Sequence, residues 1–83
     1  MPSPMDGPAT TLDRLPVGAS ASVVDVDATA ALAERLEDLG FVPGTRVTVR
    51  RRAPLGDPRV YELRGTQLCL RRSEAARIRV EPR

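Results

Sequence analysis

Residues 39–58 read LGFVPGTRVTVRRRAPLGDP, and this stretch specifies most of the fold. Gly40 follows an amphipathic run, where a helix commonly places a residue with positive φ that has no Cβ to clash. Pro43 and Gly44 are typical of the two central positions of a type II turn. Residues 45–50 then alternate polar and apolar side chains, which predicts a half-buried strand, and a loop rich in proline and glycine follows. Because the stretch holds no obligatory catalytic group, it favours a scaffold that other molecules bind.

The chain before this stretch predicts a leader, a turn and a strand. Residues 1–10 are rich in proline, serine and glycine, so we expect a disordered leader. Residues 11–18 predict a short turn or 3₁₀ piece that two leucines hold against the core. Residues 19–27 alternate again, which predicts a strand with Val24 and Val26 facing inward.

A helix is expected between this strand and the central one. From about residue 28 to 39 the apolar residues follow a helical period, and Leu32, Leu36 and Leu39 form one stripe. The opposite face is charged. The helix is therefore expected to pack against the sheet and to depend on that packing for its stability.

Two further strands, a helical turn and a closing strand are expected after residue 58. Residues 59–64 and 67–70 alternate on either side of a tight turn at Gly65 and Thr66. Residues 72–76 predict one helical turn capped by a serine, and the chain ends in a strand. Five short strands with one inserted helix predict a mainly β fold, a small and strongly bent barrel.

Length and composition limit the classes of function. Eighty-three residues make one small domain, and no apolar run approaches the ~20 residues that cross a bilayer. The N-terminus lacks the basic and apolar regions of a signal peptide, and a single cysteine suits a reducing compartment, so we expect a cytoplasmic protein without membrane insertion. The net charge is +2, and all 13 basic residues are arginine, which fits a GC-rich genome better than a dedicated nucleic-acid binder.

The residue types argue against an enzyme or a cofactor protein. Without histidine and with one cysteine, a zinc-type or other nitrogen- or sulfur-ligated metal site is close to excluded. Cys69 lies between two leucines and is expected to be a buried or half-buried hydrophobe, not a reactive thiol. No glycine-rich phosphate cradle occurs. The sequence therefore predicts no catalytic residue, no metal and no cofactor.

Two arginine clusters, at residues 50–52 and 71–72, remain as candidate contact residues. In a regular strand Arg50 and Arg52 share one face. Three interpretations stay open for these clusters: solvated charges that keep the domain soluble, contact with an acidic partner, or contact with nucleic-acid phosphates. Nucleic acid is the weakest, because barrel-shaped single-strand binders add stacking aromatics and this chain has two aromatic residues.

Three ordered motifs stand out in the sequence: LGFVPGT at residues 39–45, APLGDP at 53–58, and Gly65 with LCLRRSEA at 68–75, followed by IRV at 78–80. They resemble the FeoA family, the small cytosolic component of bacterial ferrous-iron (Feo) transport. The resemblance covers residues 11–82 and implies one FeoA-like domain over 11–83, with an SH3-like β-barrel fold and no enzymatic activity. It also implies a role in supporting or regulating FeoB, the membrane permease with a cytosolic GTP-binding domain.

A second group of relatives offers an alternative. SH3-like domains of this kind form the C-terminal part of iron- or manganese-dependent transcriptional regulators, where they pack against the rest of the protein. This chain has no helix-turn-helix segment, and its initiating methionine and short leader favour a free-standing protein. A regulator-associated domain and, less favoured, a small nucleic-acid-binding barrel are the alternatives to the adaptor.

We expect the docking surface to lie on the loop after the central strand. Proline and glycine would hold Leu55 out on a rigid support, and Phe41, past the helix end, is a second candidate anchor. The competing interpretation is that both side chains close the ends of the barrel. An open barrel edge also leaves a homo-oligomer possible in principle. The candidate partner-binding residues are Phe41, Arg50, Arg52, Pro54, Leu55, Gly56, Asp57 and Arg71.

Overall fold

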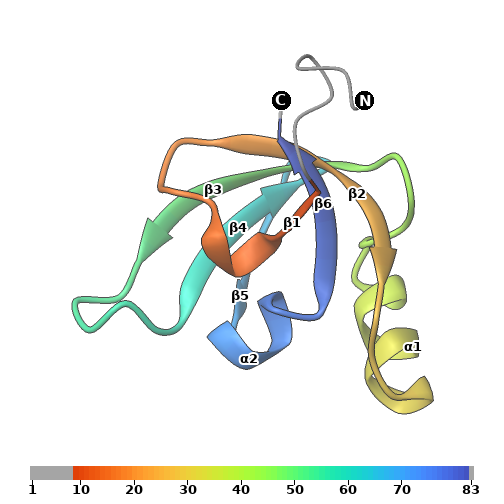
Figure 1. Ribbon diagram of the computed structural model, residues 1–83. Helices are drawn as coiled ribbons and strands as arrows, with labels where there is room; N and C mark the ends of the chain where they lie inside the picture. The colour runs from red at the N-terminus through yellow and green to blue at the C-terminus, as the bar shows by residue number, and fades with distance from the viewer. Residues whose placement is uncertain (1–8, 83) are drawn as a thin grey trace.

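The computed structural model describes residues 9–82, in which six antiparallel strands form one curled sheet (Figure 1). The strand order is β1-β6-β2-β3-β4-β5. The fold is therefore mainly β, as predicted, with six strands in place of five because the two-residue β1 pairs with β6. The elements are β1 (Thr10–Thr11), η1 (Leu12–Arg14), β2 (Ser20–Val26), α1 (Ala30–Asp38), β3 (Arg46–Arg52), β4 (Arg59–Leu63), β5 (Thr66–Leu70), α2 (Arg72–Ala75) and β6 (Ile78–Pro82).

The chain enters the sheet earlier than the sequence predicted. Residues 1–8 of the expected leader lie outside the described residues, but Thr10 pairs with Val80 of β6, so the predicted leader is too long at its end. The 3₁₀ turn η1 follows at once. Its Leu12 and the following Leu15 are buried, as predicted for a piece held against the core.

The inward face of β2 differs from the prediction because the strand contains a β-bulge. The pairing with β6 shifts between Val23 and Asp25, which leaves Val24 as the extra residue. Before the bulge Ala21 and Val23 are buried, and after it Val26 packs against the core. The prediction that Val24 faces the core is therefore wrong, while the prediction for Val26 is confirmed.

Helix α1 is shorter than predicted and ends in a Schellman motif. Gly40, with φ of 112°, donates its N–H to the Glu37 carbonyl (2.9 Å), and Phe41 donates to the Leu36 carbonyl (3.0 Å). In this motif the residue after the glycine packs back against the last turn of the helix. Phe41 is accordingly 1% exposed and lies in the core with Leu36. Phe41 is thus a buried core residue in this structure, which favours the structural interpretation over the predicted docking anchor.

The apolar stripe of α1 covers less of the helix than the sequence predicted. Leu36 is fully buried and Leu32 packs against the core, but Leu39 is 41% exposed. The helix ends at Asp38, so Leu39 occupies the C-cap, where the chain turns away from the helical period. The Thr29 hydroxyl caps the other end by accepting a hydrogen bond from the Leu32 N–H (3.4 Å).

Two tight turns connect the strands that follow. The Thr45 N–H donates to the Val42 carbonyl (3.1 Å) and Gly44 has φ of 89°, which confirms the predicted turn centred on Pro43 and Gly44. The β4–β5 hairpin turns at Arg64 and Gly65, with φ of 54° and 78°, one residue earlier than predicted. Positive φ at both central positions is the pattern of a type I′ turn, whose twist matches that of the two strands.

Candidate partner-docking surface

The loop between β3 and β4 presents an isolated apolar side chain. Its backbone closes on itself, because the Gly56 N–H donates to the Ala53 carbonyl (2.7 Å) and the Ala53 N–H donates to the Pro58 carbonyl (2.9 Å). Leu55 lies in this closed turn and is 97% exposed. In Figure 1 the loop extends outward at the left, on the opposite side of the sheet from α1. The loop thus holds Leu55 away from the body of the protein.

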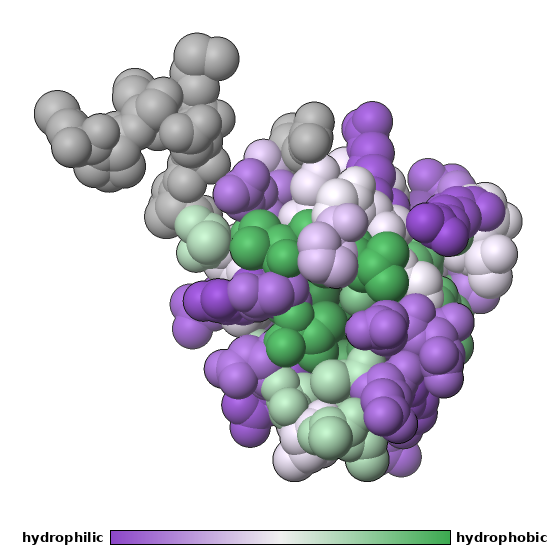
Figure 2. Space-filling model, turned by 90° about the vertical axis from the view of Figure 1, so that its right-hand side faces the viewer, coloured by the Kyte–Doolittle hydropathy of each residue, from purple (hydrophilic) through white to green (hydrophobic). Residues whose placement is uncertain are grey.

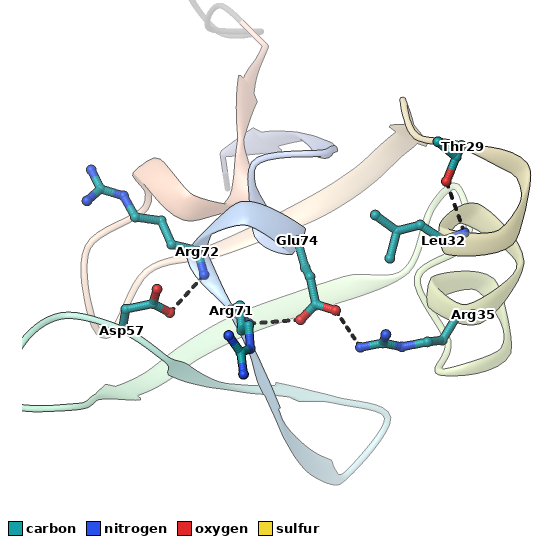
Figure 3. A network of polar contacts seen from close by, with 7 residues as sticks. All are labelled: Thr29, Leu32, Arg35, Asp57, Arg71, Arg72 and Glu74. Atoms are coloured by element: carbon teal, nitrogen blue, oxygen red, sulfur yellow. Dashed lines mark hydrogen bonds and ion pairs between the residues drawn. The ribbon is translucent and has the colours of Figure 1, made fainter.

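Asp57, which the sequence assigned to partner binding, also has a structural contact. Its Oδ1 accepts a hydrogen bond from the N–H of Arg72, the first residue of α2, at 2.9 Å (Figure 3). This carboxylate satisfies one of the N–H groups that a helix leaves unpaired in its first turn. Asp57 therefore ties the loop to α2.

Glu74 ties the same short helix to α1. Its Oε1 accepts a hydrogen bond from the Arg71 N–H (3.0 Å), and its other oxygen pairs with the Arg35 guanidinium of α1 (Figure 3). The prediction that Ser73 caps this helix is wrong, because Arg71 occupies the N-cap position and the capping contacts come from the Glu74 and Asp57 carboxylates. A four-residue helix is thereby anchored from two sides of the molecule.

A second β-bulge arranges the arginines of β3 differently from the prediction. The pairing with β4 shifts between Val49 and Arg51, so Arg50 is the extra residue. After Val49, Arg50 and Arg51 both lie on the outer face of the sheet. Arg52 pairs with Arg59 in the next row and lies on the opposite face. The prediction that Arg50 and Arg52 share a face is therefore wrong.

The outer arginines border a shallow hollow. It has a volume of about 340 Å³ and is lined by Arg50, Arg51 and Gln67, the last from β5. Arg50 forms an ion pair with Glu62 of β4 (Nε to Oε1, 3.2 Å). No salt bridge to Arg51 occurs within residues 9–82, so this guanidinium is available to a ligand.

Cys69 is exposed, contrary to the sequence prediction. It pairs with Val60 of β4, while its neighbour Leu70 is buried and Leu68 packs against the core. Because side chains alternate along a strand, inward leucines on both sides place Cys69 on the outer face. The alternation of side chains along this strand is the sequence signal that would have predicted an exposed Cys69.

Two polar residues of β4 lie at least partly inside the protein, the half-buried Arg59 and the buried Tyr61. The Arg59 guanidinium donates from Nη1 to the Leu15 carbonyl (2.6 Å). Tyr61, two residues along β4, is fully buried, as its predicted inward position requires. Burial raises the pKa of its phenol, and the charge of Arg59 opposes that rise. Among the described residues, the phenol oxygen has no hydrogen-bond partner.

Apart from Leu55, two large apolar side chains are exposed among the described residues, Val17 and Leu39. Figure 2 shows the side of the molecule that carries α1, where apolar side chains gather within a border of polar ones. Val26 and Leu32 are half-buried and pack against the core cluster. None of the described helices has the length and apolar character needed to span a membrane, and residues 9–82 contain no group of three or more cysteine, aspartate or glutamate side chains placed to hold a metal ion.

Comparisons with known proteins agree with this architecture. The family model for the FeoA domain matches residues 10–82. A fusion of Fe(2+) transport protein A with the Fe(2+) transporter FeoB from Porphyromonas gingivalis is 39% identical over 70 residues, which are 84% of this chain and 8% of the fusion protein. The crystal structure of Stenotrophomonas maltophilia FeoA with zinc, described as an SH3 domain protein, is 41% identical with a TM-score of 0.77, over 86% of this chain and 88% of that one.

The likeness to transcriptional regulators concerns the fold alone. A manganese-dependent transcriptional repressor superposes with a TM-score of 0.83 at 21% identity, over 99% of this chain and 39% of the repressor. The family match, by contrast, spans nearly every residue that the structure describes. With its small SH3-like fold, this chain belongs to the FeoA family.

Proposed function

We propose that this chain is a non-enzymatic accessory protein that binds the FeoB permease in the cytoplasm, with Leu55 as the central contact. The observation that carries the proposal is the fusion protein of Porphyromonas gingivalis, in which a relative of this domain and the FeoB transporter form one polypeptide. Fusing two domains is useful when they work side by side. A separate chain of the same family would meet its partner by non-covalent contact.

Leu55 suits such a contact because little is lost when a partner covers it. It is almost fully exposed, so its burial contributes about 1.5–3 kcal/mol to binding. Pro54, the two loop hydrogen bonds and the tie from Asp57 to α2 already restrict the backbone. A restricted loop loses little conformational entropy on binding, which leaves more of the burial energy for affinity.

The exposed arginines fit a supporting role at the rim of this contact. Arg50, Arg52 and Arg71 are all exposed, and Arg50 is paired with Glu62. Charges at the rim of an interface mainly raise the association rate with an acidic partner and add little affinity. Pro54 and Gly56 contribute by holding the loop in shape.

The test is a titration of the purified domain with the cytosolic GTP-binding domain of the cognate FeoB and, separately, with the whole permease in detergent. Replacing Leu55 by Asp is expected to weaken binding at least tenfold while leaving the fold unchanged by circular dichroism. Leu39→Asp is the matched control, because Leu39 is the exposed leucine at the end of α1, on the opposite side of the sheet. Unchanged binding of a folded Leu55→Asp variant would contradict the proposal.

A further inference from the structure

Strand β5 forms a free edge of the sheet. It pairs with β4 and with no other strand among the described residues, since it ends the strand order. A free edge offers unpaired backbone N–H and C=O groups to another extended chain. In this fold the edge is five residues long, from Thr66 to Leu70.

The hairpin geometry identifies which backbone groups are available. In a two-residue hairpin the residues that flank the turn, here Leu63 and Thr66, bond to each other, and bonded pairs then alternate along the ladder. The backbones of Leu68 and Leu70 therefore also bond to β4. Gln67 and Cys69 direct their N–H and C=O groups away from β4, and both residues are exposed.

Positive charge surrounds this edge. β5 contains no charged residue, but Arg64 precedes it and Arg71 follows it, and both are exposed. Arg51 lies in the same row as Cys69, across Val60, and lines the hollow together with Gln67 of β5. Within residues 9–82 no salt bridge neutralises any of these three arginines.

Two occupants of the β5 edge are compared, a second copy of this chain and an acidic strand of another protein, and the charges favour the acidic strand. If a second copy paired antiparallel with this edge, the start of β5 in one copy would meet the end of β5 in the other, which brings Arg64 of one copy near Arg71 of the other. Like charges brought together in this way are destabilising. An acidic strand would instead bring carboxylates to the same arginines, which can bind carboxylates through two parallel hydrogen bonds.

We propose that the β5 edge accepts an extended acidic segment of a partner protein as a seventh strand. The backbone of the segment bonds to Gln67 and Cys69, and its carboxylates contact Arg51, Arg64 and Arg71. This is the β-augmentation mode of peptide recognition, in which the main chain supplies affinity and the flanking side chains supply specificity. The inference does not depend on Leu55 or on the proposed partner, since it concerns a different surface.

A designed peptide tests the inference directly. The probe is a capped heptapeptide in which glutamate and valine alternate, titrated into the ¹⁵N-labelled protein, and the control peptide carries lysine in place of glutamate. We expect amide shifts concentrated at residues 66–70 and near Arg51, affinity that falls as salt is added, and no binding of the lysine peptide. Shifts elsewhere, equal binding of both peptides, or self-association of the protein through β5 would overturn the inference.

Two matched variants separate backbone pairing from simple charge attraction. Cys69→Pro removes an N–H that the fold itself does not use, and proline is tolerated on edge strands, so the variant is expected to fold and to bind the glutamate peptide roughly tenfold more weakly. Cys69→Ser keeps the N–H and is expected to bind normally. Unchanged binding by Cys69→Pro would overturn backbone pairing.

A modified peptide gives the same answer without changing the protein. Methylating the backbone nitrogens on one edge of the glutamate peptide removes its donors, and we expect binding to be lost with that peptide. Full binding of the methylated peptide would overturn the inference. Leu55→Asp is expected to leave glutamate-peptide binding intact, which separates this surface from the Leu55 loop.

Discussion

Tyr61 is the largest fully buried side chain of the protein, and its ring and its hydroxyl contribute differently. The ring fills the core, while the phenol oxygen lacks a hydrogen-bond partner among the described residues. Removing a buried hydroxyl that has no partner is close to neutral, whereas removing a buried ring leaves a cavity.

For Tyr61→Phe we expect the free energy of unfolding to change by less than about 1 kcal/mol. Tyr61→Ala is the contrasting variant and is expected to lose about 3–5 kcal/mol. Urea unfolding followed by circular dichroism measures both. A loss of more than about 2 kcal/mol for the phenylalanine variant would show that the hydroxyl has a bonding partner.

Gly40 is needed for its conformation and also for its lack of a side chain. Its φ is 112°, and a Cβ added there would lie 2.9 Å from Leu63 Cδ1, inside the core. Gly44 has a similar φ of 89° but open space around it. Positive φ alone costs an alanine about 1–2 kcal/mol.

We therefore expect Gly40→Ala to destabilise the protein by about 1 kcal/mol more than Gly44→Ala, because the buried Leu63 must shift to make room. The urea unfolding midpoints of the two variants are compared. Because both glycines have positive φ, the cost of positive φ cancels in this comparison. Equal losses would mean that the core adjusts to the added methyl group without strain.

Asp25 of β2 forms a cross-strand ion pair with Arg79 of β6. Hydrogen bonds from the Arg79 guanidinium lower the pKa of this carboxyl below its ordinary value of 3.8. A carboxyl with a lowered pKa in the folded state contributes stability above its unfolded pKa and loses it as the pH falls through the folded pKa. The contribution is therefore complete near neutral pH and disappears in acid.

The expected result is an NMR titration of the Asp25 carboxyl carbon with a midpoint below 3.8. In Arg79→Gln, which keeps the strand but removes the charge, the midpoint is expected to rise toward that ordinary value. An unchanged Asp25 midpoint in Arg79→Gln would rule out Arg79 as the cause.

Among the elements, α2 shows how a helix too short to be stable alone can be fixed by its neighbours. The Asp57 carboxylate of the β3–β4 loop accepts a hydrogen bond from the first residue of α2, and Glu74 links the helix to Arg35 of α1. Helices of this length do not persist in water without tertiary contacts. The loop and both helices therefore act as one connected unit.

Replacing Asp57 by Ala is expected to cost about 1 kcal/mol, the usual value of a helix cap, while Asp57→Asn keeps an acceptor oxygen and costs a few tenths. Hydrogen exchange should show faster exchange of the α2 amides in the alanine variant. If the alanine and asparagine variants unfold at the same urea concentration, the contact to Arg72 does not stabilise the helix.

The wrong predictions of side-chain direction in the strands come from the two β-bulges. The alternation rule correctly identified β2 and β3 as strands, and it placed Val26 inward. It failed at Val24 and at Arg52, because one extra residue reverses which face the following side chains take. A bulge depends on how two strands pair, and nothing in the sequence of either strand marked it.

For the molecule as a whole, most of the architecture followed from the sequence, whereas the partner-binding role of the candidate residues stays a prediction. Turn glycines, strand periods and the FeoA-like motifs predicted the small β-barrel and the loop that carries Leu55. The sequence left open whether Phe41 is buried or exposed, because the Schellman motif is completed by a long-range core that the local sequence does not describe. The contact of Asp57 with α2 joins segments 15 residues apart and was equally invisible.

Addition of metal ions tests the alternative that this chain is a metal-sensing domain of the kind found in transcriptional regulators. Residues 9–82 contain no cluster of three potential metal ligands, so we expect ferrous or manganous ion to leave the melting temperature unchanged within about 1 °C. Magnesium at equal concentration controls for ionic strength. A melting temperature that rises specifically with ferrous or manganous ion would support a metal-sensing role.

The self-closed loop that carries Leu55 also bears on how such a protein can diverge. Its tip is hydrogen-bonded within itself, and Leu55 contributes nothing to the core. A mutation at Leu55 can therefore change the surface of the loop without lowering stability, and selection on binding is uncoupled from selection on folding. Under the proposed function, drift in the partner can then be matched by a substitution at this position, while the barrel beneath it stays as it is.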